Sequence, residues 1–569
     1  MIMLPELPND NPPEVYRTRS DWKLVAPFAF VVALQVIGTF VNDNNVWGVN
    51  LWSIFPVWAI VAVTAVYVLV SVPSVSLRLY QHGEPVVALI FDISKRWPKG
   101  VKWTLVTLLF AVLAWLLRSR ALIYGDGFVV VSISDRPFAN AFVTLHDYYR
   151  PLTILIQQSS QMLRYLGLDD KETIFWTMRV IEGVIGWLGL LRLVRSATDE
   201  SVSRAIMFLT ALTSGCVVLL LGWVELYVLP TALLLWLLAS AVRYVKHTGS
   251  FWPIGIFGLL AMASSAVIAP VTIMVVLLSL KLHGDVPLAR WIPRPRVLLL
   301  LVVLLAIGAG VAFNLLTEVN FVVPLVATSI NPYWTLSPRH LADLINLMLF
   351  VSPVLIAFLV MTFLNRADRR WMKEPTAILI GLAGFTCMLV TFWLNPVLGA
   401  PCDWDLLSFF GFPMTLLAGY ALSKMVTDAR QRRLLTVQLM LVAAILLVPN
   451  VYDKTHLDTA VRRIEPLAWN DIHYQPSYYQ AHRCISFGSL LLQNCGEDRL
   501  AEKYFRRRIQ AKPDDELGWY NLGVLFFKRQ QYRQAADCFE RAVELKPSSV
   551  EYRKSLQAAS VEAMHHPGQ

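Results

Sequence analysis

The sequence predicts an all-α protein in which a polytopic bundle of membrane-spanning helices is followed by a small domain of repeated helices. Two observations predict the bundle: 56% of the 569 residues are hydrophobic and only 16% are charged, and the mean hydropathy is +0.52. Apolar stretches of about 20 residues, the length that crosses a bilayer, recur up to position 450. A third observation, a 34-residue pattern at 516–549, predicts the repeated helices.

Residues 1–23 are polar and contain prolines, so we expect a cytoplasmic segment and no cleavable signal. The net charge of +10 fits the Lys and Arg excess of cytoplasmic loops, and we expect no nucleic-acid partner. The bundle, 24–450, is expected to hold about thirteen spans, at 24–42, 51–72, 101–117, 174–194, 205–221, 224–242, 252–268, 270–283, 297–316, 341–363, 376–394, 406–423 and 434–450.

The orientation of these spans follows from Lys and Arg in the short loops. Six basic clusters fall on one side if 252–283 is a hairpin that turns near Ala269-Pro270; a single span there would reverse every later segment. With the hairpin, the N-terminus is cytoplasmic and the chain from Pro449 onward is extracytoplasmic. Four arginines depart from the rule and fall outside, which indicates that the outer loops hold something anionic: Arg118, Arg120, Arg136 and Arg150.

The large outer loop, 118–173, contains the first candidate site residues. Glycines flank Asp126 in the stretch from Tyr124 to Phe128, which leaves its carboxylate accessible, and His146 and Asp147 follow. A mostly apolar helix at 152–166 is expected to lie in the membrane interface. Asp126 also fits a helix cap or a solvated turn, and His146 with Asp147 fits ordinary loop polarity.

The other outer loops, 222–223, 317–340 and 395–405, carry the remaining candidates in or beside them. A carboxylate at the mouth of a span, such as Glu225, is a functional candidate because its burial is costly. Asp403 and Asp405 alternatively form a solvated loop end, the three tryptophans alternatively anchor the interface, and Arg179 can simply pair with Glu182. The candidates of these regions are Arg179, Trp223, Glu225, Trp334, Arg339, His340, Asp403 and Asp405.

The C-terminal domain, 482–569, follows a connector at 451–481 that is rich in aromatic residues. Residues 516–549 match the tetratricopeptide repeat, a degraded copy precedes them, and a helix at about 550–563 is expected to cap the array. The repeats at 482–549 either recruit an acceptor or protein partner, or only stabilise the fold. The matching positions are Trp519, Leu522, Gly523, Phe526, Tyr532, Ala535, Phe539, Ala542 and Pro547.

The acidic loop with its interface helix resembles that of polytopic glycosyltransferases of the C superfold, which include protein O-mannosyltransferases and oligosaccharyltransferases. The repeats after the spans are similar to lumenal O-mannosyltransferases of the TMTC type. Residues 101–450 carry most of the resemblance. Two departures are that the acidic loop follows the third span and that one short motif does not contain a pair of acids.

The resemblance implies an integral membrane enzyme, in a multi-pass topology of the bacterial inner membrane, that uses a polyprenyl-phosphate-linked sugar. It implies inverting transfer to an acceptor protein, lipid or glycan on the extracytoplasmic side, with Asp126 as general base. Glu225 or Asp147 would assist the base or bind a divalent cation, Mg or Mn. Donor phosphate would bind Arg150, Arg179, Arg339 and His340; acceptor or sugar would contact Tyr124, His146, Trp223, Trp334, Asp403 and Asp405.

Two other functions remain open from the residues alone. A transporter or flippase of lipid-linked sugar would need ionisable residues deep in several spans. A non-catalytic membrane scaffold would act through its repeats, and it would lose function when 482–569 is deleted but not when Asp126 is replaced.

Overall fold

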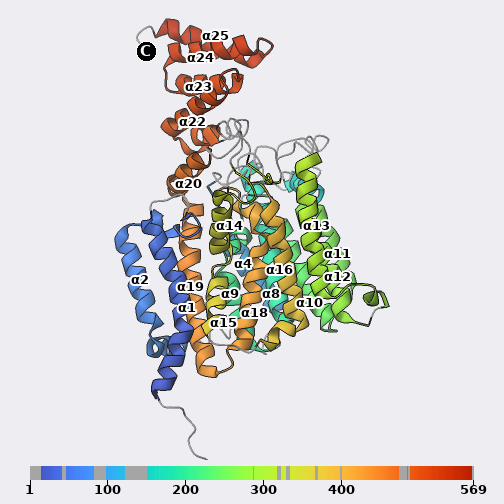
Figure 1. Cartoon of the computed structure of the whole chain (residues 1–569). Coiled ribbons are helices and arrows are strands. Elements are labelled where there is room, and N and C mark those ends of the chain that lie inside the picture. Colours follow the sequence, from blue (N-terminus) through green and yellow to red (C-terminus); the bar gives the residue numbers. More distant parts are fainter. Residues whose placement is uncertain are drawn as a thin grey trace, which may run out of the picture.

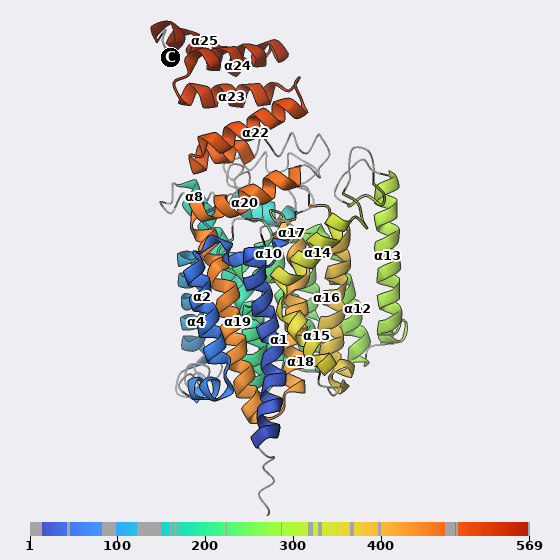
Figure 2. The same cartoon turned by 60° about the vertical axis from the view of Figure 1, so that its left-hand side comes forward.

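The fold is seen in a computed structural model (Figure 1). It describes residues 14–41, 46–81, 98–121, 150–159, 162–163, 165, 167, 170–223, 225–285, 287–316, 322–327, 333–364, 369–396, 400–472, 484 and 487–566. Within these residues the chain forms a tall helical bundle, and a second stack of helices extends from one of its ends (Figures 1 and 2).

The bundle is organised around α10, most of whose residues are buried, and α8 packs along it. Both helices are long and apolar enough to be spans, and α10 is the more deeply buried of the two. Figure 2 shows them among the other helices of the bundle. The helices of the bundle are α1 (Glu14–Phe40), α2 (Val57–Ser71), α4 (Lys99–Leu116), α8 (Lys171–Ala197), α9 (Ser201–Leu212), α10 (Val228–Val245), α11 (Trp252–Ser264), α12 (Ala269–His283), α13 (Pro295–Leu316), α14 (Pro338–Val351), α15 (Val354–Leu364), α16 (Pro375–Trp393), α17 (Trp404–Leu407), α18 (Gly411–Met425) and α19 (Ala429–Thr455).

The prediction of thirteen spans is only partly met. Seven helices are long and apolar enough to cross a bilayer, and nine segments qualify if each of two bent pairs counts as one. The bent pairs turn by 85° after Ser71 and by 92° after Val351. The other predicted spans coincide with shorter apolar helices, at Trp103–Leu116, Ser201–Leu212, Trp252–Ser264 and Pro295–Gly308.

One short segment shows why an apolar stretch need not form a single long helix. The predicted span 205–221 is helical as α9 and continues as a 3₁₀ helix, Gly215–Leu220, which is buried throughout. Trp187 donates its Nε1–H to Leu220 O at 3.1 Å, and Ser214 donates to Val351 O. An irregular backbone segment is tolerated inside the bundle because neighbouring helices supply hydrogen bonds to it.

The two ends of the bundle differ in character. At one end, here called the basic end, Lys and Arg pair with acids on neighbouring helices: Arg430 with Asp21 at 3.0 Å, Lys424 with Glu374 at 2.9 Å, Lys246 with Asp199 at 3.4 Å, and Arg432 with Glu200. The opposite end, here called the repeat end, is where α19 leaves the bundle toward the C-terminal helices (Figure 1).

Segment 252–283 forms a hairpin. Phe251, just before α11, packs on Tyr244 with ring centroids 5.6 Å apart, and His283, at the end of α12, stacks on the same tyrosine at 4.0 Å. The turn between α11 and α12 lies at the other end, where Ser264 O accepts a hydrogen bond from Thr153 at 2.8 Å. Both ends of the segment therefore meet the last turn of α10, which a single straight span could not achieve.

The connector contains helix α20 (Leu457–Ile472), on which the C-terminal helices rest. Lys503 of α22 (Asp498–Ala511) pairs with Glu465 at 2.8 Å and lies 3.8 Å from the ring centroid of Trp469. Tyr504 donates its hydroxyl to Glu465 O. These contacts fasten the repeat domain to the bundle through a packed helix.

The predicted repeat is confirmed as the helix pair α23 (Glu516–Lys528) and α24 (Tyr532–Leu545), and the predicted cap as α25 (Val550–His565). A Cβ at Gly523 would lie 2.7 Å from the Phe539 ring, which explains the glycine of the repeat pattern. In the degraded copy, the described residues of the first helix end in a π-helical turn at Leu491–Cys495.

The turn before α23 makes the stability of the repeat dependent on pH. Burial by itself raises the pKa of Asp515, but hydrogen bonds and charge from Arg508 outweigh it and the net pKa is lowered. The hydrogen bond from Lys546 lowers the pKa of Glu516. A carboxyl whose folded pKa is lowered stabilises the fold above its unfolded pKa, about 4, and that stabilisation is lost as the pH falls through the folded pKa.

We therefore expect amide protection in 498–566 of the full chain to decline as the pH falls from about 5 to about 3. Asp515→Asn should show weaker protection at neutral pH and a flatter decline. Hydrogen exchange, expressed as protection factors so that the intrinsic pH dependence cancels, measures both. An equal decline in Asp515→Asn and in the parent chain would contradict the role of this carboxylate.

Candidate functional site

Two of the predicted outer loops meet at the repeat end through a buried tryptophan. Trp223 donates its Nε1–H to Asp405 Oδ2 at 2.7 Å, across 182 positions of sequence, and its ring meets Trp404 edge-on at 5.1 Å. Gly222 precedes it with φ of +71°, and a Cβ there would lie 2.9 Å from the Cβ of Arg118. The glycine turn thus directs Trp223 into the core, where both tryptophans are about 1% exposed or less.

A cation lies against this tryptophan. Lys454 Nζ is 5.3 Å from the Trp223 ring centroid and 3.2 Å from Asp453 Oδ2. Arg463 of α20 binds the same Oδ2 at 2.8 Å. The backbone oxygen of Lys454 accepts hydrogen bonds from the N–H groups of Arg120 and Ala121, at 3.0 and 3.1 Å. The end of α19 therefore also holds the start of the large loop.

A second buried pair continues this network. Arg339 Nε lies 3.2 Å from Asp343 Oδ2, and Asp343 Oδ1 accepts the Nε1–H of Trp47 at 3.1 Å. The backbone oxygen of Trp47 accepts a hydrogen bond from Arg463 at 3.3 Å. The third predicted loop is thus linked to Asp453 through contacts of Arg339, Asp343, Trp47 and Arg463, which are mostly buried.

The polar residues beside α8 form a separate pair. Arg179 NH1 lies 2.9 Å from Glu182 Oε2, which confirms the expected i, i+3 pairing. The same guanidinium group donates to the backbone oxygen of Glu225 at 3.0 Å. The side chains of Arg179, Glu182 and Glu225 are all buried. The hydrogen bond from Arg179 to the second loop is made to the backbone oxygen of Glu225.

The large loop returns to the bundle at Arg150, whose guanidinium lies 5.5 Å from the Tyr227 ring centroid. Helix α7 follows at Pro151–Ser159, shorter than the predicted 152–166 because 162–163 and 165 are in a 3₁₀ turn. Its Thr153, Ile154, Gln157 and Gln158 are buried, whereas Leu155 is exposed. A helix whose polar side chains pack on protein and whose leucine is left outside is suited to a membrane interface.

Two arginines mark the other end of the large loop. Arg118 lies 4.3 Å from the ring centroid of Trp115 and 5.4 Å from that of Trp176. Burial lowers the pKa of Arg118, and the charge of Arg120 lowers it further. Two neighbouring arginines favour an anion nearby, since arginine stays protonated in proteins.

The structure therefore brings together Trp223 and Asp405 directly, Arg179 and Glu225 through a backbone oxygen, and Arg339 with the first cluster through Asp343 and Trp47. His340 Nδ1 lies 3.1 Å from the Tyr333 hydroxyl, and Trp334 N donates to Ser337. Asp403 immediately precedes α17 and is buried.

Four predicted residues lie outside the described part of the chain: Tyr124, Asp126, His146 and Asp147.

The network also contains charged residues that the sequence reasoning missed, namely Asp343, Asp453, Lys454 and Arg463. The predicted span 434–450 ends too early, because α19 continues to Thr455 and carries Asp453 and Lys454 inside. Charges immediately after a long apolar stretch could have indicated these two residues. Asp343, by contrast, reads as an ordinary i, i+4 partner of Arg339.

The predicted divalent cation can be tested against the donor set. Asp405 already accepts from Trp223 and from the N–H of Leu406, and Asp453 already binds two cations. Among the described side chains of the repeat end, no three His, Cys, Asp or Glu ligands lie within 4.8 Å of one another. A Mg or Mn ion at Glu225 or Asp147 stays an expectation, and Asp147 lies outside the described residues.

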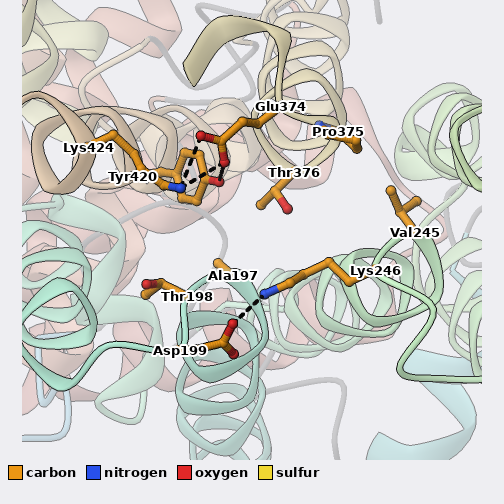
Figure 3. A pocket seen from close by; sticks show the side chains of 10 residues that line it. All are labelled: Ala197, Thr198, Asp199, Val245, Lys246, Glu374, Pro375, Thr376, Tyr420 and Lys424. Carbon is orange, nitrogen blue, oxygen red and sulfur yellow. Dashed lines mark hydrogen bonds and ion pairs between the residues drawn. The ribbon is translucent and has the colours of Figure 1, made fainter. Parts of the chain in front are cut away.

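A cavity of about 440 Å³ opens at the basic end, away from these residues. Figure 3 shows two charged groups on opposite walls, Lys246 with Asp199 and Lys424 with Glu374 and Tyr420. Because each lysine faces a carboxylate, the walls suit a small polar group rather than an apolar one. The lining residues are Ala197, Thr198, Asp199, Val245, Lys246, Glu374, Pro375, Thr376, Tyr420 and Lys424.

Comparison with known proteins identifies only the C-terminal part of the chain. Residues 517–549 match the tetratricopeptide repeat family. A tetratricopeptide repeat-containing protein of Caenorhabditis elegans, trd-1, is 32% identical over 82 residues, which is 14% of this chain and 10% of that protein. The chain thus spans a tenth of the length of this curated relative. No solved structure matches the chain.

Proposed function

We propose that this chain is an integral membrane glycosyltransferase that moves a sugar from a polyprenyl-phosphate donor to an acceptor on the extracytoplasmic side. One observation carries the proposal: buried acids, cations and tryptophans from the predicted outer loops gather at the repeat end. Trp223, Asp405 and Lys454 are its centre. Buried charges are costly, and in membrane proteins they often mark functional sites.

The outer surface of the bundle supports membrane insertion. Large apolar side chains on its peripheral helices are exposed, among them Trp58 at 74%, Leu305 at 69% and Phe363 at 87%. Such surface is unfavourable in water and suits lipid. The basic end would face the cytoplasm by the positive-inside rule, which puts the repeat domain outside.

The described contacts suggest a division of roles. Asp405 and Asp453 are engaged by Trp223, Lys454 and Arg463, so we assign them to positioning. Arg118, Arg120 and Arg150, at the two ends of the large loop, are suited to the donor phosphate. Arg179 is paired with Glu182 and is better explained as structural.

In the proposed reaction an acceptor hydroxyl attacks the anomeric carbon of the donor sugar. A carboxylate takes the hydroxyl proton, the bond between sugar and phosphate breaks, and polyprenyl phosphate leaves with the bonding pair. Cations at the membrane interface stabilise the charge on that phosphate. Asp126 is our candidate base, and Glu225 or Asp147 is our candidate for the acid that assists it.

The repeat domain would bring a protein acceptor or partner to this end. Its attachment to α20 through Lys503 and Glu465 is direct, and Arg463 of the same helix reaches Asp453. A partner bound on the repeats would thus be held by the helix that contacts the charged network.

The test is to incubate the purified full chain in liposomes with a panel of labelled polyprenyl-phosphate hexoses and measure release of polyprenyl phosphate. This readout does not require the acceptor to be known. Asp405→Asn should lower release about tenfold, because it weakens one charge-assisted hydrogen bond worth about 1.5–3 kcal/mol. Asp199→Asn, at the basic end, is the matched control and should match the parent chain.

The orientation of the chain in the membrane is measured separately. Protease added to sealed vesicles should cleave the repeat domain only when the extracytoplasmic face is outside. If a well-folded protein cleaves none of the donors in the panel, the proposed glycosyltransferase activity is wrong. If protease cleaves the repeats from the cytoplasmic face, the proposed orientation is wrong.

A further inference from the structure

We propose that His247, His283 and Asp285 form a binding site for a divalent transition metal, of which Zn²⁺ is the best fit. The three side chains each offer one ligand atom, and these atoms lie within 4.8 Å of one another. They come from two separate elements, the turn after α10 and the end of α12. The site is at the basic end and is independent of the glycosyltransferase proposal.

The donor set suits Zn²⁺. Two imidazole nitrogens and one carboxylate oxygen are a combination that Zn²⁺ binds, at about 2.0–2.2 Å from each ligand. Tetrahedral binding at such distances puts ligand atoms about 3.3 Å apart. The side chains of His247 and Asp285 are 55% and 77% exposed. The His247 ring packs on His283 with centroids 4.2 Å apart, so it would have to rotate to direct a nitrogen at the ion.

The orientation of His283 also suits a metal ligand. Its Nδ1 lies 2.9 Å from the backbone oxygen of Tyr244, and its ring stacks on that tyrosine with centroids 4.0 Å apart. Metal-binding histidines usually donate one ring N–H to a carbonyl or a carboxylate, which leaves the other nitrogen unprotonated and able to bind the ion. The Tyr244 carbonyl therefore sets both the tautomer and the direction of Nε2.

The backbone conformation at His247 is unusual for a histidine. This residue has φ of +55°, in the left-handed region, and follows the end of α10 at a position where glycine is preferred. His247 N donates to Tyr244 O, and Thr248 N donates to Arg243 O, which closes the helix. Glycine would suit this turn better, so the histidine is the less favourable choice for the backbone alone.

The electrostatic surroundings of the three side chains favour a cation. His283 is in the last turn of α12, and His247 lies two residues past the end of α10. The C-terminal ends of helices favour cations. The nearby cations are directed elsewhere: Lys246 to Asp199 and Ser196 O, Lys281 to Ala289 O, and Arg243 to Thr248 O.

Gly284, with φ of +84°, reverses the chain after α12 so that Asp285 returns toward His247, at 3.6 Å. A bound metal would fasten the end of α10 to the end of α12. Val245 and Lys246, which immediately precede His247, line the cavity at the basic end. The metal would thus hold one wall of that cavity in place.

The experiment is to strip the tag-free full chain with a chelator in detergent and titrate it with Zn²⁺ by calorimetry, with Co²⁺ absorption as a second readout. We expect one ion per chain at this site. His283→Ala and His247→Gly should each weaken binding at least tenfold, since even second-shell changes cost 10–100-fold. His247→Gly should not lower the melting temperature without metal, because glycine suits the left-handed turn.

The chain offers a matched control in His456, which stacks on Tyr452 at 4.0 Å with its Nδ1 3.0 Å from Tyr452 O. It reproduces the His283 arrangement but belongs to no three-ligand group in the described chain. His456→Ala should leave Zn²⁺ affinity unchanged. The proposal is overturned if the parent chain binds no Zn²⁺, or if His247→Gly and His283→Ala bind it as the parent does.

Discussion

Replacing Asp453 with alanine is expected to lower the free energy of unfolding by roughly 3–5 kcal/mol, because two cations then lose a shared buried counter-ion. Asp453, Lys454 and Arg463 have side chains 1%, 1% and 4% exposed, and one carboxylate oxygen contacts both cations. The loss should also loosen the attachment of α20, since Arg463 links that helix to Trp47 O.

The measurement is the shift of the denaturation midpoint of the full chain in detergent, with Asp458→Ala as control. Asp458 is an exposed acid in the first turn of α20, only five positions away. A triple variant that replaces Asp453, Lys454 and Arg463 with hydrophobic residues should recover much of the stability, because a buried ionic group can often be exchanged for apolar packing. Equal losses in Asp453→Ala and Asp458→Ala would show that the network contributes nothing.

Asp126→Asn is expected to lower sugar transfer by about 10²–10⁴-fold, the usual contribution of a positioned general base. Asparagine keeps the shape of the side chain and removes its ability to accept a proton. Asp126 lies outside the described residues, but Ala121, near the start of the same loop, donates its N–H to Lys454 O. The loop thus leaves the bundle beside Trp223 and Asp405.

Release of polyprenyl phosphate from the labelled donor is the readout, at matched protein levels in the membrane. Asp199→Asn again serves as control, because its carboxylate is exposed and pairs with Lys246 at the opposite end. Full activity of Asp126→Asn would exclude this residue as the base. Parallel losses of activity and of folded protein would assign it a structural role instead.

Much of the fold was predictable because its signals are local. The apolar stretches predicted where helices form, and the pattern from Trp519 to Pro547 predicted the helix pair α23 and α24. The predicted lengths were less accurate. Hydropathy does not register that 205–221 changes from α-helix to 3₁₀ helix, since that change depends on partners such as Trp187 and Val351.

The candidate site was predictable in its parts but not in its connections. Trp223, Asp405 and Arg339 were selected because of their positions in outer loops, and their partners lie up to 182 positions away. Asp453 and Arg463 were missed because a charge that follows a span looks like an ordinary interfacial residue until its burial is known. His247, His283 and Asp285 were missed for a related reason. His247 meets the other two only because the end of α12 packs beside the end of α10.

The sequence by itself determined the helical class, the position of the repeat and the asymmetric distribution of basic residues, because hydropathy, turn residues and charge are properties of short segments. Only the tertiary structure decided that 252–283 is a hairpin, that Lys454 lies against Trp223, and that two histidines and an aspartate converge at the basic end. The physical reason is that these contacts depend on how distant helices pack, and packing is a property of the whole bundle.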